Sequence, residues 1–240
     1  MARTPYAYAP EGAFNNEVTI SGQEAVHLHS VLRLRVGDLF TAFDGKGRGW
    51  VCTVQSVEAK RLRGEVREVL PLEPEPALKL TAATAVVKGV HIEWAVEKAA
   101  ELGVERFVPL LTQRGVASPG AGRLERWRSI ALAAAKQSQR RTLMQILDPL
   151  TIEGLLNIAG NNDYLCALEN QCPDCTLGHY AFSLKSGISL ILIVGPEGGF
   201  TPEELCIFRA HSTPLVSMGD HPLRTETALV VAAGYLMLTV

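Results

Sequence analysis

The sequence lacks both of the common phosphate-binding motifs of nucleotide-binding α/β proteins. Its glycine-rich run from Gly195 to Phe200, GPEGGF, does not fit G-x-G-x-x-G, and no G-x-x-x-x-G-K-S/T occurs. The run also carries Glu197, an acid that would repel a triphosphate. These features argue against a Rossmann-type oxidoreductase or another nucleotide-binding α/β enzyme, an alternative that binding of NAD or ATP would support.

Long apolar runs and cysteine pairs are also scarce. The longest apolar run, Ala228 to Val240, is shorter than the roughly 20 residues of a membrane span, so we expect a buried helix and no membrane contact. The first residues lack the apolar segment of a secretory signal, and five cysteines, an odd number, suit a reducing cytoplasm. Cys172 and Cys175 have no second pair at zinc spacing, so no metal is expected.

An apolar run, a glycine turn and a helix start follow one another between Ser189 and Leu205. The first six residues are typical of a parallel strand that is buried on both faces. Thr201 as N-cap, Pro202 at the first helical position and Glu204 in a capping box predict the helix start. This order places a small-molecule site at the carboxyl end of a strand, although a plain tight connection would have the same order.

The first 70 residues have the pattern of an all-β module. The run DGKG from Asp44 to Gly47 predicts a hairpin, and a third strand has alternating apolar positions at Leu62 and Val66, with Val69 as a further candidate. A short helix is expected before them, from Gln23 to Leu34. The expected strands cover residues 38–44, 49–57 and 61–70.

Residues 71–76, PLEPEP, predict a stiff linker because proline recurs at every second or third position. We therefore expect domains at 1–70 and 77–240. In the second domain strands alternate with helices, which predicts an α/β fold with a parallel sheet. The expected strands cover residues 78–87, 104–111, 163–168, 189–194 and 214–218, and the expected helices cover residues 92–102, 124–138, 152–158, 202–211 and 226–238.

Charge is unevenly distributed along the chain. Residues 151–240 hold 3 basic and 9 acidic side chains, whereas Arg123–Arg141 holds six cations and one acid, Glu125. Such a basic run is typical both of a solvated helix face and of a surface that contacts phosphates. Arg33, Arg35, Lys46 and Arg48 are expected to surround the hairpin of the first module, where they could also meet a polyanion.

Two motifs in the C-terminal half resemble the signature of a known family. They are VGPEGGF, from Val194 to Phe200, and MGDHPLRTETA, from Met218 to Ala228. The sequence is similar in them to the RsmE family of 16S ribosomal RNA (uracil-N3) methyltransferases, which belongs to the SPOUT superfamily. Further similar positions are His27, Val31–Arg33, Phe43–Gly45, Lys88-Gly89, Glu97-Lys98, Glu101–Gly103, Arg126-Trp127, Ala134-Ala135, Gln137-Ser138 and Arg140.

The resemblance implies a PUA-like N-terminal β-barrel that helps to hold RNA and a SPOUT-type parallel sheet with a trefoil knot. It also implies an obligate homodimer that uses S-adenosylmethionine. In one respect the sequence departs from the family. Members commonly have a basic and then an aliphatic residue before Leu-Arg, where this chain has His221 and Pro222. Proline has no backbone N–H, so any adenine contact through the amide of residue 222 is lost. The residues that would hold the cofactor are Leu168, Val194, Gly195, Pro196, Glu197, Gly198, Met218, Gly219 and Leu223.

The implied reaction methylates N3 of a uridine in the 16S RNA of the small ribosomal subunit. N3 carries a proton at neutral pH, so the enzyme must remove it and stabilise the charge that remains. We expect Arg224 to stabilise the anionic base or its phosphate, and Glu226 or Glu197 to accept the proton or to orient Arg224. A local salt link between Arg224 and Glu226 that caps the last helix is the alternative.

RNA contacts are expected at six basic residues, each of which could instead be an ordinary solvated charge. The six residues are Arg33, Arg35, Lys98, Arg126, Arg140 and Arg141.

A non-catalytic RNA-binding module is a further alternative for the whole protein, and it would bind RNA without binding a cofactor. Because N3 lies on the pairing edge, the target uridine must be unpaired or flipped out.

Overall fold

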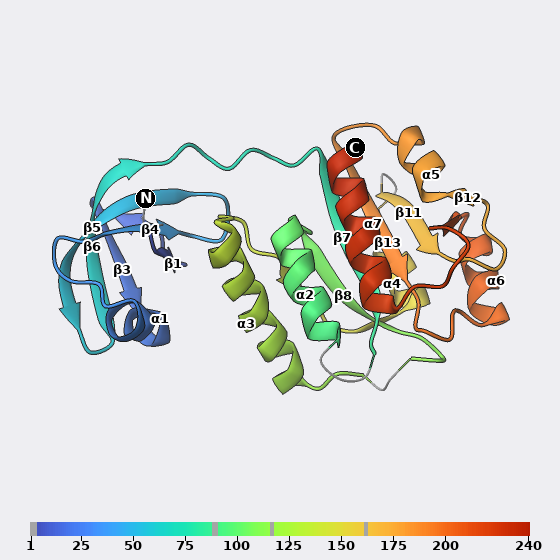
Figure 1. Cartoon of the computed structure of the whole chain (residues 1–240), viewed down its shortest axis with the longest axis horizontal. Helices are drawn as coiled ribbons and strands as arrows, with labels where there is room; N and C mark the ends of the chain where they lie inside the picture. The colour runs from blue at the N-terminus through green and yellow to red at the C-terminus, as the bar shows by residue number, and fades with distance from the viewer. Residues whose placement is uncertain (1–3, 88–90, 116–117, 161–162) are drawn as a thin grey trace. The chain divides into compact units, whose positions relative to one another are not determined.

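The computed structural model describes residues 4–87, 91–115, 118–160 and 163–240. These residues form two compact units. The N-terminal unit contains the chain up to Glu75 together with Ala135–Leu143, and the C-terminal unit contains Pro76–Ala134 together with Met144–Val240. Each unit has its own buried apolar core, and Figure 1 labels the helices and strands named below.

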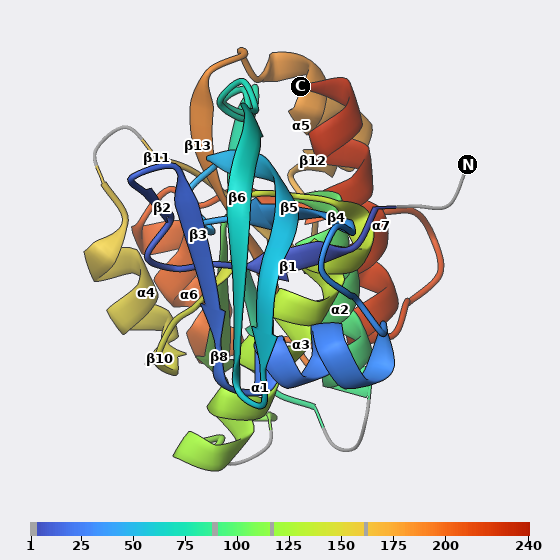
Figure 2. The same ribbon diagram turned by 90° about the vertical axis from the view of Figure 1, so that its left-hand side faces the viewer.

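A six-stranded sheet forms most of the N-terminal unit, with the strand order β1-β4-β5-β6-β3-β2. β1 pairs in parallel with β4, and the other neighbours are antiparallel. In Figure 2 the ribbons of β1 and β4 run across the direction of β5 and β6, so the sheet curls around a core that includes Phe40 and Leu62. The strands are β1 (Tyr6–Tyr8), β2 (Ala13–Phe14), β3 (Glu17–Ser21), β4 (Leu39–Phe43), β5 (Gly49–Glu58) and β6 (Arg61–Val69).

The three predicted strands of this unit are confirmed as β4, β5 and β6, but β1, β2 and β3 were not predicted. The expected inward position of Val69 is wrong, because its side chain is 69% exposed. Val69 is the last residue of β6 and lies three positions after Val66, and the two-residue alternation of a strand puts residues three apart on opposite faces.

The predicted helix from Gln23 to Leu34 is shorter in the structure. α1 (Gly22–Val26) continues into a π-helix, η1 (His27–Val31). Arg33 then has a positive φ of 58°, a left-handed conformation that cannot continue a right-handed helix. The cations of this region therefore lie on an irregular turn.

A parallel sheet forms the centre of the C-terminal unit, with the order β10-β8-β7-β13-β11-β14-β12 and β9 beside β8. β13 lies between β7 and β11 and is buried on both faces, as its sequence predicts. The strands are β7 (Leu78–Ala85), β8 (Arg106–Leu111), β9 (Gln145–Ile146), β10 (Leu150–Thr151), β11 (Asp163–Leu168), β12 (Cys175–Thr176), β13 (Ile188–Val194) and β14 (Leu215–Ser217).

Helices cover both faces of this sheet. Side chains of α2, α3, α5 and α7 share one buried cluster with Leu190 and Leu192, whereas α4 and α6 share another with Ile191 and Ile193. Figure 1 shows α2 and α7 side by side on the first face. The helices are α2 (His91–Leu102), α3 (Ala121–Ser138), α4 (Ile152–Ile158), α5 (Leu177–Ser183), α6 (Pro202–Ala210) and α7 (Thr225–Thr239).

The mixed α/β architecture with a parallel sheet agrees with the prediction, and the five predicted helices match α2, α3, α4, α6 and α7. β9, β10 and β12 were not predicted because two residues are too few to show a period, and α5 was also missed. Lys88 and Gly89, which resemble the family motif, lie outside the described residues. In the part of the chain that the structure describes, no helix combines the length and apolar character needed to cross a membrane.

Candidate functional site

Three strands of the C-terminal unit end at the same edge of the sheet. Leu168 at the end of β11 is in register with Val194 at the end of β13 and with Val216 in β14. The loops that follow β11, β13 and β14 therefore start next to one another. In open parallel sheets the carboxyl ends of the strands are where ligands bind.

The glycine loop after β13 is fixed by packing and by the predicted helix cap. The capping box is confirmed: Thr201 Oγ1 accepts from Glu204 N, and Glu204 Oε2 accepts from Thr201 N. The other carboxylate oxygen of Glu204 accepts from Gln113 N at 2.8 Å, which ties this helix start to the loop after β8. A Cβ at Gly195 would lie 3.0 Å from the Phe200 ring, so the ring packs directly on the loop backbone.

A hydrogen bond joins the glycine loop to the start of α7. Thr225 is buried, and its Oγ1 donates to the Gly195 carbonyl at 2.9 Å. After β14, Gly219 has a positive φ of 123°, a conformation that favours glycine and turns the chain towards α7. The loops after β13 and β14 are thus held together by a buried contact.

The three loops enclose a cavity of about 380 Å³. This volume is within the range of about 300–1,000 Å³ that is usual for small-molecule sites. The cavity brings together eight of the nine residues predicted to hold a cofactor, and Asp220 lines it where Gly219 was expected. The eight residues are Leu168, Val194, Gly195, Pro196, Glu197, Gly198, Met218 and Leu223.

Glu169 is a cavity residue that the sequence analysis missed. It is only 9% exposed, and its Oε1 accepts from the backbone amides of Asn170 and Gln171, both at 2.8 Å. No described residue donates to its second oxygen, Oε2. An acid directly after an apolar strand at the carboxyl edge of a parallel sheet is the signal that could have identified it.

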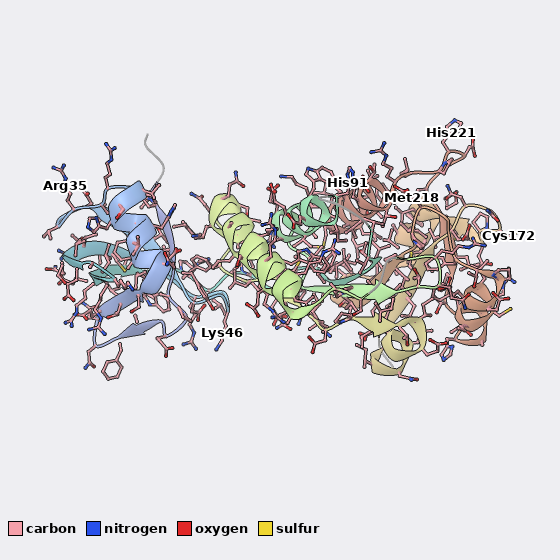
Figure 3. All side chains as sticks on the ribbon, turned by 90° about the horizontal axis from the view of Figure 1, so that it is seen from below. Arg35, Lys46, His91, Cys172, Met218 and His221 are labelled. Atoms are coloured by element: carbon pink, nitrogen blue, oxygen red, sulfur yellow. The ribbon has the colours of Figure 1, made fainter. Side chains whose placement is uncertain are left out.

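A second hollow of about 520 Å³ adjoins this cavity and shares Glu197, Pro222 and Leu223 with it. Its other lining residues are His91 and Arg224. Figure 3 labels His91 and Met218 on the same side of the C-terminal unit. The sequence analysis did not single out His91, because a lone histidine at a helix start has no pattern of its own.

Glu226 is buried and pairs with His91 across two helices. Its Oε1 lies 3.2 Å from His91 Nδ1. The alternative of a local salt link between Arg224 and Glu226 is wrong, because among the described residues Arg224 has no carboxylate within 4.0 Å of its side-chain nitrogens. Arg224 instead borders the second hollow as an exposed cation.

Two family models match the chain. One, described as an RNA methyltransferase domain, matches residues 73–237, and the other, described as an RNA methyltransferase PUA domain, matches residues 20–67. Ribosomal RNA small subunit methyltransferase E of Synechocystis is 34% identical over 227 residues, 93% of this chain and 74% of that protein. The chain belongs to the ribosomal RNA small subunit methyltransferase E family.

Other similar proteins cover most of the chain. The protein of the same name from Bacillus subtilis is 30% identical over 222 residues, 89% of this chain and 87% of that protein. A crystal structure of the Neisseria gonorrhoeae protein of this name, bound to S-adenosyl methionine, has a TM-score of 0.89 at 27% identity and covers 98% of both chains. A putative methyltransferase from Legionella pneumophila, in complex with the same cofactor, has a TM-score of 0.88 at 28% identity, with 99% and 98% covered.

Two of the six cations expected to contact RNA are paired with neighbouring carboxylates. Arg126 donates to both carboxylate oxygens of Glu93, and these hydrogen bonds lower the pKa of Glu93. Lys98 donates to Glu101 and to Glu97, which raises the pKa of Lys98. Each of these charges is therefore already partly balanced.

Arg140 and Arg141 belong to the segment that packs with the N-terminal unit. Arg141 Nη1 donates to the Pro71 carbonyl at 2.6 Å, and Arg141 N donates to Glu73. Among the described residues nothing pairs with the Arg140 side chain. Of the cations predicted on this stretch, Arg140 is therefore the one whose charge is most available.

The basic residues of the first 70 positions do not gather around the hairpin as expected. Figure 3 shows Arg35 and Lys46 at opposite ends of the N-terminal unit. Arg35 N donates to Asp38 Oδ2, whereas Lys46 and Arg48 border a cavity beside Trp50. No group of three or more His, Cys, Asp or Glu side chains suited to a metal ion occurs among the described residues.

The buried bond between Thr225 and Gly195 leads to a prediction about stability. Thr225→Val keeps the shape of the side chain but leaves the Gly195 carbonyl without its donor, so the free energy of unfolding should fall by about 1–3 kcal/mol. Urea unfolding measures this change, with Thr239→Val as the control, because the Thr239 hydroxyl bonds only within its own exposed helix end. Equal midpoints for the two variants would contradict the structural role of this bond.

Proposed function

We propose that the chain is an S-adenosylmethionine-dependent methyltransferase that modifies N3 of a uridine in the 16S RNA of the small ribosomal subunit. The observation that carries the proposal is the cavity at the carboxyl edge of β11, β13 and β14, because two solved structures of the same fold are described with that cofactor bound. The reaction would take place in the cytoplasm, where this RNA is made.

The residues of the cavity fit the chemical parts of the cofactor. Leu168, Val194 and Leu223 offer apolar surface to an adenine ring, and Glu169 offers an unpaired carboxylate oxygen to the ribose hydroxyls, as acids do in other nucleoside sites. Glu197 and Asp220 suit a sulfonium cation. When bound, S-adenosylmethionine supplies an electrophilic methyl group.

The adjoining hollow suits the target base. A uridine placed there would lie beside the cavity, because Glu197, Pro222 and Leu223 line both spaces. Arg224 has no ion-pair partner among the described residues, so its guanidinium can stabilise the negative charge that spreads over the base oxygens once N3 loses its proton. Glu197 would help to position the donor and the base.

We further propose the division of work that the family resemblance implies. Residues 1–70 would be a PUA-like β-barrel that binds RNA, 71–76 the linker, and 77–240 a methyltransferase domain with a trefoil knot. The curled six-stranded sheet supports the first assignment. The meeting of the loops after β13 and β14 beside β11 supports the second.

The phosphate contacts of the substrate are proposed at the six predicted cations. Arg140 and the Arg33–Arg35 turn are the best placed of them, because Arg126 and Lys98 would have to exchange a carboxylate for a phosphate. Each contact formed should steepen the fall of the logarithm of the RNA binding constant with the logarithm of the salt concentration by about 0.7–0.9. The six cations are Arg33, Arg35, Lys98, Arg126, Arg140 and Arg141.

A homodimer is proposed from the surface of α7. Val231, Tyr235 and Leu238 are spaced along one face of this helix and are 50%, 42% and 86% exposed. Such an apolar stripe on a helix is typical of a protein interface. Its opposite face, with Leu229 and Leu236, belongs to the core of the unit.

The dimer proposal predicts that a charge in the stripe separates the subunits. Val231→Asp would place a carboxylate where the partner helix packs, so analytical ultracentrifugation at micromolar concentration should show a dimer for the unchanged protein and a monomer for the variant. Ile158→Asp, at an exposed apolar position on α4, is the control and should remain dimeric. A monomeric unchanged protein would contradict the proposal.

The carboxylate of Glu169 predicts a loss of cofactor affinity on substitution. Glu169→Ala removes a charged acceptor, worth about 1.5–3 kcal/mol in a hydrogen bond, so the Kd for S-adenosylmethionine should rise about tenfold or more. Equilibrium dialysis with the tritiated cofactor measures it. Glu153→Ala, at an exposed acid on α4, should leave the Kd unchanged. Unchanged affinity in folded Glu169→Ala would remove Glu169 from the site.

The reaction itself is tested on 16S ribosomal RNA and on small subunits that lack the modification. The purified protein should transfer one methyl group per RNA, and mass spectrometry of nuclease digests should identify 3-methyluridine. Arg224→Ala should lower kcat by about 10²–10³ because it removes charge stabilisation from the transition state, whereas Arg209→Ala, at an exposed arginine of α6, should not. RNA binding without any methyl transfer would favour the non-catalytic module.

A further inference from the structure

We propose that His91 is the catalytic base that accepts the N3 proton of the target uridine, and that Glu226 is the residue that positions it. The inference rests on the proposed function. It rests on a pairing that no sequence motif contains, because His91 opens α2 and Glu226 lies in the first turn of α7. These two helices pack side by side on one face of the sheet (Figure 1).

The carboxylate of Glu226 lies beside the imidazole ring of His91. Glu226 Oε1 lies 3.2 Å from His91 Nδ1, and the Glu226 side chain is 8% exposed whereas that of His91 is 52% exposed. A carboxylate this close favours the tautomer of the neutral ring that has its proton on Nδ1, because that N–H can donate to the carboxylate oxygen. The lone pair of the neutral ring is then on Nε2, which no described residue contacts through a hydrogen bond.

His91 lies where its Nε2 lone pair can reach the target base. His91 lines the hollow that we assign to the target base, together with Glu197, Pro222, Leu223 and Arg224. Three of these residues also line the cofactor cavity. A base in this open hollow would therefore border both the cofactor cavity and the imidazole.

The proton balance of the step is complete with these groups. His91 Nε2 takes the N3 proton, and the electrons of the N–H bond stay on N3. Those electrons form the N3–CH₃ bond while the electrons of the breaking S–CH₃ bond return to sulfur, which becomes a neutral thioether. His91 then releases its proton to water, to which its half-exposed ring has access.

The charged groups around His91 have different roles in the step. Glu226 on α7 stabilises the imidazolium that forms, as the carboxylate does in other histidine–carboxylate pairs. Arg224, at the N-cap of α7, faces the charge left on the base, and Glu197 is the other titratable group of the hollow. An imidazole is a stronger base than a carboxylate in the neutral range, so His91 suits the proton transfer better than either glutamate.

The test separates a base from a mere cation beside Glu226. His91→Gln should lower kcat by about 10²–10⁴, the usual contribution of general base catalysis, with KM and cofactor affinity nearly unchanged. His91→Lys keeps a positive partner for Glu226 but offers no free lone pair at neutral pH, so its kcat should fall as far. A plot of log kcat against pH for the unchanged protein should rise with unit slope through the neutral range. Both variants should lack this rise.

A second readout does not depend on activity. Long-range ¹H–¹⁵N spectra of the full chain, with the His91 signals assigned by their loss in His91→Gln, should show the Nδ1–H form of the neutral ring. Glu226→Gln should weaken that preference, because the anionic partner of the ring is lost. His179→Gln, at a histidine on α5 away from the site, should leave the His91 signals unchanged.

The outcomes distinguish this inference from the proposed function. Full activity of His91→Lys, or an Nε2–H form of neutral His91, would overturn the role of His91 while leaving the methyltransferase intact. If the unchanged protein transferred no methyl group to ribosomal RNA, the proposed function would fail and the role of His91 with it.

Discussion

The parallel pairing of β11 with β13 on one side and with β14 on the other is the constraint on which the site depends. It brings Leu168, Val194 and Val216 into register, so three loops leave the sheet at one edge. Apolar side chains on both faces of β13 fix this register, because a slip by one residue would turn each of them to the opposite face. The cavity is a consequence of that packing.

The same constraint explains why α7 takes part in the site although most of it belongs to the core. Thr225 bonds to Gly195, so the first turn of the helix is held against the glycine loop. Glu226 then faces His91 at the start of α2, and Arg224 projects at the edge of the hollow. The groups that we propose for binding and for reaction are thus carried by elements that the core keeps rigid, which is what efficient positioning requires.

Local features could be predicted from the sequence, and contacts between distant segments could not. The strand before the glycine loop and the capping box of Thr201 and Glu204 depend on neighbouring residues, and both are confirmed. The pairing of His91 with Glu226 depends on how two helices pack, which local sequence patterns do not show. The Glu169 carboxylate was missed although its place after an apolar strand was visible in the sequence.

Binding of S-adenosylmethionine in the cavity is the central claim, and calorimetry on the purified full chain tests it most directly. Titrations with S-adenosylmethionine, NAD and ATP should give saturable binding of the first alone, because the loops carry acids beside the glycines and no phosphate-binding motif. Saturable binding of NAD or ATP without binding of S-adenosylmethionine would contradict the account.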